Sequence, residues 1–225
     1  MVTPSPIPLR ERKHAQTKLA LMRAALEGME RRPLEEVPVK DLCDTAMVSE
    51  ATFFNYFPRK SDVLAYYSQL WTLELGWHGR QTAARTPGLP AIEEVFRQAA
   101  RRVQERPGVM GEVIAYHARQ RQRAAAAALG RAERALAFPD LAGIEEIPVG
   151  GLEVVLVPNL QYAIEHGALP PNTHLHSVMV ALVALFYGTP LALMRSNPAG
   201  VAGAYAHQLL MLWNGVRATA GARQG

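Results

Sequence analysis

Cysteine is almost absent from this chain, which has one, Cys43, among its 225 residues. One cysteine excludes an internal disulfide and fits a reducing compartment, so the sequence predicts a cytoplasmic protein. Cys43 falls at an inward position of a short predicted helix, and we interpret it as a core residue rather than a redox sensor. His174 and His176 would point in different directions on a helix, so they make a poor metal pair. We therefore expect neither a metal site nor a cofactor.

Several sequence patterns of other protein classes are missing as well. The chain has no Gly-rich phosphate loop, no nucleophile motif and no metal-binding pair at helical spacing, so we predict that it is not an enzyme. It also has no extended period-two alternation, which excludes a fold built on strands. The remaining signal is helical throughout. We predict an all-α fold.

A long uncharged apolar run occurs once, over residues 178–194. Gly188, Thr189 and Pro190 interrupt it, and the fully apolar part is too short to cross a bilayer. A helix that is apolar on all sides is also typical of a doubly covered helix at a subunit interface. We therefore expect no membrane contact.

Charge is moderate and evenly spread. Charged residues make up 20% of the chain and hydrophobic residues 49%, an ordinary globular balance. The formal net charge of +4, with a pI near 9.4, is compatible with a polyanionic partner. Yet residues 1–60 hold ten Lys and Arg against eight Asp and Glu, so their net charge is only +2. The argument for nucleic acid therefore rests on where individual residues stand.

Apolar residues recur at helical spacing along the chain. In the first predicted helix Leu19, Met22, Leu26 and Met29 form one stripe. The clearest break follows at residues 86–90, which contain two prolines and a glycine. We expect about nine to ten helices, in a flexible arm over 1–10, a three-helix unit over 11–60 and a helical part over 61–225.

Residues 38–60 are the most informative stretch, because they predict two short helices joined by a tight turn. The second helix carries small, polar and aromatic side chains, which suit a DNA major groove. Ser49 is placed to cap this helix. An ordinary three-helix cluster with a solvated polar face is the alternative. The predicted inward residues are Leu42, Ala46, Val48, Phe53 and Phe57.

The motif resembles the N-terminal DNA-binding domain of the TetR family of bacterial repressors, over residues 11–66. The matching residues are Val48-Ser49-x-x-Thr52-x-Phe54-x-Tyr56-Phe57-x-x-Lys60, preceded by Val39-x-x-Leu42-x-x-x-Ala46. Three positions depart from the pattern: Phe54 replaces a usual tyrosine, Tyr56 a frequent histidine, and Met47 the usual glycine of the turn. A left-handed turn at Met47 would cost energy that glycine avoids.

The resemblance implies a set of DNA contacts. Lys40, Glu50 and Ala51 would face base edges, since lysine suits guanine acceptors and glutamate the cytosine amino group. The arm residues Arg10, Arg12 and Lys13 would reach a minor groove, or else form a solvated charge run. The residues expected along the DNA backbone or at the start of the reading helix are Ser49, Thr52, Phe54, Asn55, Tyr56 and Lys60.

The resemblance also implies pairing of two subunits through the last two helices. The alternative is that the chain itself covers these apolar faces. We expect a homodimer, because the helix from residue 174 to 194 is apolar on too many sides for one neighbour. The predicted dimer interface comprises Leu175, Val178, Leu182, Leu185, Phe186, Leu209, Leu212 and Trp213.

In this family a small-molecule effector binds among the middle helices. We expect an unknown hydrophobic or amphipathic molecule here, although for each candidate residue core packing is the alternative. The basic run over 117–123 would meet an anionic ligand or form a solvated helix face. The candidate ligand-binding residues are Trp71, Trp77, Phe96, Met110, Ile114, Tyr116, His117, Tyr162, Tyr187 and Met194.

The sequence therefore predicts a ligand-responsive, homodimeric repressor that a small molecule releases from a palindromic operator in double-stranded DNA. The alternative is a TetR-like DNA-binding regulator without a small-molecule inducer, controlled by a protein partner.

Overall fold

The computed structural model describes residues 7–120 and 129–221, and within these ranges the chain is helical with no strands. The predicted all-α fold and the number of helices are confirmed. Three short 3-10 turns join the longer helices: η1 (Leu34–Glu36), η2 (Ile144–Glu146) and η3 (Pro198–Gly200). The helices are α1 (Leu9–Met29), α2 (Val39–Ala46), α3 (Glu50–Tyr56), α4 (Asp62–Ala83), α5 (Leu89–Glu105), α6 (Pro107–Arg119), α7 (Arg131–Ala137), α8 (Glu153–Glu165), α9 (Leu175–Leu193) and α10 (Val201–Gly221).

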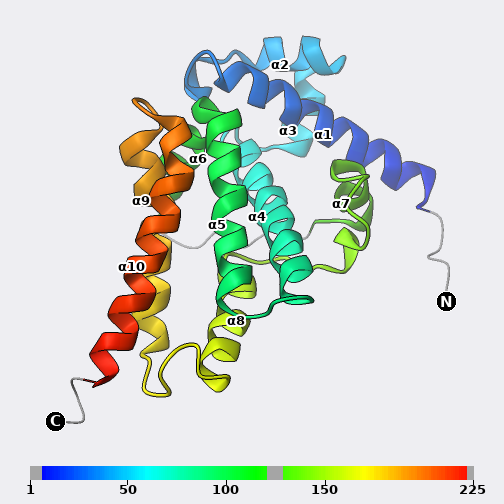
Figure 1. Cartoon of the computed structure of the whole chain (residues 1–225). Helices are drawn as coiled ribbons and strands as arrows, with labels where there is room; N and C mark the ends of the chain where they lie inside the picture. Colours follow the sequence, from blue (N-terminus) through cyan, green and yellow to red (C-terminus); the bar gives the residue numbers. More distant parts are fainter. Residues whose placement is uncertain (1–6, 121–128, 222–225) are drawn as a thin grey trace.

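The helices form a small head and a larger body (Figure 1). Helix α1 runs across the top of the molecule, α2 packs against it, and α3 packs against α2 (Figure 1). The other contacts of α1 are with α4, α6 and α7 of the body. Helices α4 and α5 pack along each other in the centre, and α9 and α10 lie side by side along one edge (Figure 1). The head and the body therefore share α1.

Prolines and glycines set several helix ends. Pro38 precedes α2, and Pro90 and Pro107 stand in the first turns of α5 and α6, where a missing backbone N–H costs nothing. Gly88 has φ +90 at the start of α5, a conformation that favours glycine. Helix α1 begins at Leu9, so the last two residues of the predicted arm are helical. Residues 1–6 of that arm lie outside the described residues.

Helix α1 is buried on two faces. Leu19, Met22 and Leu26 form the predicted stripe and turn toward the body. Leu21 and Ala25 lie on another face of the helix and are fully buried as well. Burial on both faces anchors α1 between the head and the body. Each Å² of apolar surface removed from water contributes about 25 cal/mol to the stability of the fold.

Pro190 leaves one carbonyl of α9 without its helical donor. In a regular helix the Phe186 carbonyl would accept a hydrogen bond from the N–H of residue 190, but proline has no N–H. The hydroxyl of Tyr205 in α10 donates to that carbonyl at 2.6 Å, and both side chains are buried. The irregularity in α9 is thus compensated by a specific contact from α10, which fixes how the two helices pack.

Most residues of the predicted dimer interface are covered within the chain. Val178, Leu182, Phe186, Leu209 and Trp213 are buried against the chain's own helices, and Trp213 Nε1 donates to Glu93 Oε1 at 3.2 Å. These residues therefore hold α9 and α10 on the body, while Leu175, Leu185 and Leu212 are half-buried. The apolar residues that the chain leaves open on these helices are Val180 (55% exposed), Val183 (38%), Leu191 (61%), Leu210 (55%) and Met211 (60%).

Among the described residues one helix, α9, is long and apolar enough to cross a membrane by length and composition. Its most apolar stretch has a mean hydropathy of 1.7, and 28% of that stretch is buried in the chain. The low buried share follows from the outer stripe of Val180, Val183 and Leu191, which lacks a cover within the chain.

The pairing of Tyr205 with Pro190 gives a stability prediction. Tyr205→Phe should lower the free energy of unfolding by about 1–3 kcal/mol, because it strips the donor from a buried carbonyl. The control is the same change in a Pro190→Ala background, where the backbone N–H at position 190 supplies the missing donor. Urea unfolding of the four proteins should show a smaller cost in that background, and an equal cost would contradict the pairing.

Candidate DNA-binding face and ligand cavity

The turn between α2 and α3 is left-handed at Met47. Its φ of 53 and ψ of 47 make Met47 the single non-glycine residue with positive φ among the described residues. The N–H of Val48 bonds to the Cys43 carbonyl at 3.0 Å and closes the end of α2. The methionine side chain is 91% exposed. The turn therefore forms without the usual glycine, at a cost in backbone energy.

Ser49 caps α3 as the sequence predicts. Its Oγ accepts a hydrogen bond from the Thr52 N–H at 3.2 Å and lies 2.9 Å from the Thr52 hydroxyl. Below the helix, Phe53 and Phe57 are buried with their ring centres 5.7 Å apart. The cap and the aromatic underside fix which face of α3 points outward.

The outer face of α3 holds most of the predicted DNA contacts. Thr52 and Tyr56 are half-buried at its flanks, and Tyr56 packs on His14 of α1 with ring centres 4.6 Å apart. Phe54 is 46% exposed. The structure therefore brings the α3 residues together on one outward face. Its exposed residues are Glu50, Ala51, Phe54 and Asn55.

Two predicted lysines flank this face. Lys40 is exposed in the first turn of α2. The ammonium of Lys60 instead donates to the carbonyls of Glu35 at 2.7 Å and Val37 at 3.0 Å, which ties the start of α4 to η1. An ammonium has three N–H donors, so one is left for a phosphate oxygen. Arg10, Arg12 and Lys13 are exposed on the first turns of α1.

Ionic contacts fasten the head to the body. Lys18 of α1 pairs with Glu133 of α7 at 2.8 Å and lies 4.2 Å above the Tyr66 ring. Burial raises the pKa of the Tyr66 hydroxyl. On the other side, Arg119 of α6 pairs with Glu35 at 2.9 Å. Helix α1 and η1 are thus held from two separate directions.

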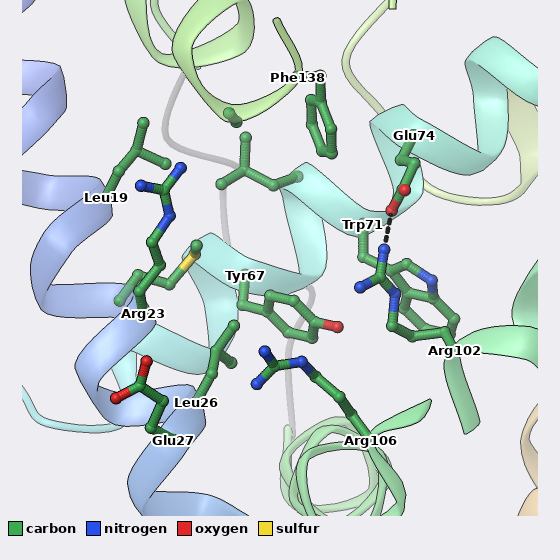
Figure 2. Close-up of a pocket in the computed structure, with 13 residues that line it drawn as sticks. Leu19, Arg23, Leu26, Glu27, Tyr67, Trp71, Glu74, Arg102, Arg106 and Phe138 are labelled. Carbon is green, nitrogen blue, oxygen red and sulfur yellow. Dashed lines mark hydrogen bonds and ion pairs between the residues drawn. The ribbon is translucent and has the colours of Figure 1, made fainter. Parts of the chain in front are cut away.

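A cavity of about 370 Å³ opens where α1, α4, α5 and α7 meet. Figure 2 shows apolar side chains on its floor and charged side chains around them. This volume lies within the range of small-molecule sites. The lining residues are Leu19, Met22, Arg23, Leu26, Glu27, Tyr67, Leu70, Trp71, Glu74, Arg102, Arg106, Ala137 and Phe138.

The charged groups of the cavity are unequally paired. Arg102 donates to Glu74 at 2.6 Å, whereas Arg106 stands 3.8 Å from Glu30, beyond hydrogen-bond distance. Nearby, Tyr67 is 6% exposed and its hydroxyl has no hydrogen-bond partner among the described residues. Burial raises the pKa of Tyr67 to about 12, so the hydroxyl keeps its proton at neutral pH.

The predicted ligand residues do not share one cavity. Trp71 lines it, but Phe96 packs edge-on against Phe186 and Tyr205 in the core, and Met110 and Ile114 are buried. Aromatic and apolar residues are equally typical of a core, so their character alone does not place them at a ligand. The other candidates also lie outside the cavity lining: Trp77, Tyr116, His117, Tyr162, Tyr187 and Met194. Trp77 Nε1 donates to the Ala142 carbonyl at 2.9 Å. His117 packs on Tyr187, and Tyr162 stacks on His166.

The basic run over 117–123 does not line the cavity either. His117 and Arg119 are exposed, and Arg119 is paired with Glu35. Although His117 is exposed as a whole residue, partial burial of its imidazole ring lowers its pKa. Arg121 and Arg123 lie outside the described residues. The arginines of the cavity, Arg23, Arg102 and Arg106, come from helices distant in sequence, and the one local signal is the four-residue spacing of the last two.

Comparisons with known proteins agree with this architecture. Residues 21–67 match the family model of the bacterial regulatory proteins of the tetR family. The comparison with curated proteins finds no match. A solved structure from Thermus thermophilus, FadR in complex with lauroyl-CoA, is a TetR-family repressor; it is 21% identical and covers 87% of this chain and 92% of its own, with a TM-score of 0.62.

Two further structures are similar. A TetR transcriptional regulator from Rhodococcus sp. RHA1 is 15% identical over 89% of this chain and 97% of its own, with a TM-score of 0.56. The ketosteroid transcriptional regulator KstR2 of Mycobacterium tuberculosis is 15% identical over 89% of this chain and 94% of its own, with a TM-score of 0.54. At these identities the likeness establishes the fold.

The left-handed turn gives a prediction with a definite sign. Met47→Gly should raise the free energy of unfolding by about 1 kcal/mol, because glycine adopts positive φ without the steric cost. Ala46→Gly, one residue earlier in the helical backbone, is the control and should lower it by about 1 kcal/mol. Chemical unfolding measures both changes, and a loss of stability in Met47→Gly would contradict the strain.

Proposed function

We propose that this chain, a regulator of the TetR family, binds a palindromic DNA operator as a homodimer and releases it when a small molecule enters the cavity. The observation that carries the proposal is the outer face of α3, where Glu50, Ala51 and Asn55 are exposed beside Phe54 and above a buried aromatic underside. In this role the protein is a transcriptional repressor of the cytoplasm rather than an enzyme.

The proposed DNA contacts divide into two kinds. Lys40, Glu50 and Ala51 are exposed at the leading ends of α2 and α3, where a helix entering the major groove meets base edges. Thr52, Asn55 and the remaining donor of Lys60 flank them and suit phosphate oxygens. Phe54 has no hydroxyl, so it contributes apolar contact only.

The uncovered faces of α9 and α10 support a homodimer. Val180, Val183 and Leu191 are three and eight residues apart, about one and two helical turns, and so share one side of α9, and Leu210 and Met211 stand on the neighbouring helix. Such a contiguous apolar surface marks an interface, and a two-fold pair would place two α3 helices on the two halves of a palindrome. The proposed interface is therefore this exposed stripe, because most of the residues predicted from the sequence are covered within the chain.

The cavity and the similar structures support a small-molecule effector. The cavity is large enough for a small ligand, and its wall includes α1 of the head. The similar Thermus thermophilus FadR structure contains lauroyl-CoA, and KstR2 is described as a ketosteroid regulator. An amphipathic effector therefore fits this chain better than control by a protein partner alone.

Selection of binding sites from a random pool of double-stranded DNA tests DNA reading. We expect a palindrome, bound with strong salt dependence. Glu50→Ala should relax the base preference at one position of each half-site by about 1–3 kcal/mol, because the carboxylate is aimed at base edges. Asn55→Ala is the matched control on the same face. It should weaken binding to all sequences alike, and unchanged base preference in Glu50→Ala would count against direct readout there.

The dimer can be tested on its exposed stripe. Leu210→Asp and Val180→Asp should convert the dimer to monomers in sedimentation velocity, since each places a charge in an apolar interface. Both changes lie on exposed positions and should leave the helical fold intact by circular dichroism. Ala84→Asp, exposed just beyond α4, is the control and should remain dimeric. Dimers that persist in both interface variants would refute the stripe as the interface.

A further inference from the structure

The cavity between α1, α4, α5 and α7 combines an apolar floor with a charged rim. Leu70 and Trp71 are buried on the α4 side, and Leu26 is buried on α1. Arg23 and Glu27 are exposed on α1, and Arg106 faces them from the end of α5 (Figure 2). A molecule that fills this space must be apolar at one end and polar at the other.

An unpartnered buried hydroxyl points to what the polar end is. Tyr67 is more than nine-tenths buried, and Figure 2 shows its hydroxyl turned into the cavity between Arg102 and Arg106. No described residue accepts a hydrogen bond from this hydroxyl. A buried polar group without a partner costs about 1–3 kcal/mol, which a ligand atom that accepts this hydrogen bond would recover. With two guanidinium groups beside it, that acceptor is best negatively charged.

The ion pairs of the cavity leave positive charge available. Glu74 accepts a hydrogen bond from Arg102 at 2.6 Å, whereas the carboxylate of Glu30 lies 3.8 Å from Arg106. Arg23 forms no ion pair within the described part of the chain. Glu27 is the other acidic residue of the described lining. The 3.8 Å contact with Glu30 leaves the N–H donors of Arg106 without a hydrogen bond there, so an anion in the cavity can accept from Arg106 and from Arg23.

We propose that this cavity binds a small amphipathic anion, a carboxylate or phosphate monoester on an apolar body. Arg106 and the Tyr67 hydroxyl hold the head group, Arg23 faces it from α1, and the apolar body lies on Leu70 and Trp71. A volume of about 370 Å³, near the lower end of ligand cavities, limits the enclosed part to a short chain or a small ring system.

The regulatory consequence rests on the proposed function. The anion bridges Arg23 on α1 of the head and Arg106 at the end of α5 in the body, so its binding energy depends on the distance between these helices. A ligand that favours a spacing other than the DNA-bound one shifts the head toward that spacing and weakens operator binding. By thermodynamic reciprocity, operator DNA weakens binding of that ligand by the same factor.

Calorimetric titration with octanoate, octyl phosphate and neutral 1-octanol tests the site. We expect at least one of the two anions to bind about tenfold more tightly than 1-octanol, and the tighter one identifies the head group. Arg106→Gln should weaken that anion about tenfold, the factor for one charge-assisted hydrogen bond, and leave 1-octanol unchanged. Tyr67→Phe should weaken it a few-fold. Arg80→Gln, exposed on α4 outside the cavity, is the control and should bind like the unmodified chain.

The outcomes separate the two proposals. Equal affinities for 1-octanol and both anions, unchanged anion binding in folded Arg106→Gln, or no binding of either anion at millimolar concentration would each overturn the anion site. Operator binding by the ligand-free chain is measured separately. Its absence would overturn the proposed function but not the anion site, which the titration decides.

Discussion

The burial of α1 on two faces is the constraint on which the rest of the structure depends. Leu21 and Ala25 are buried on one face, and Leu19, Met22 and Leu26 are buried on another. A helix packed on one side only would leave the head free to move on a tether. Packed on both sides, α1 transmits any change in its contacts with the body to α2 and α3.

The helix ends and the DNA-binding head were predictable because local chemistry decides them. Proline in the first turns, the Ser49 cap and the spacing of Phe53 and Phe57 act within a few residues of the chain. The outward side of α3 follows directly from these contacts. Even the left-handed turn at Met47 could be anticipated, since the flanking hydrogen bonds require that conformation whichever residue occupies it.

The interface and the cavity could not be predicted in the same way. Helix α9 is apolar around its whole circumference, so Val178 and Leu182, which face inward, look no different in sequence from Val180 and Val183, which face outward. In such a helix the spacing of apolar residues does not indicate which side faces the core. The cavity depends on side chains from four helices, and no sequence pattern places Arg23 opposite residues about eighty positions later in the chain.

Under the proposed function, the place of the cavity would let a modest ligand act on DNA. Polar contacts add to the packing of α1 in holding the head, chiefly the largely buried Lys18–Glu133 pair and the exposed Arg119–Glu35 pair, and an exposed pair contributes about 1 kcal/mol or less. A tenfold preference of a ligand for one spacing of α1 amounts to about 1.4 kcal/mol, which is comparable. In a two-fold dimer both heads shift together on a rigid palindrome, so the loss of fit is felt at two half-sites. In the proposed mechanism, a ligand in a cavity between α1 of the head and the body therefore needs no large rearrangement of the body to release DNA.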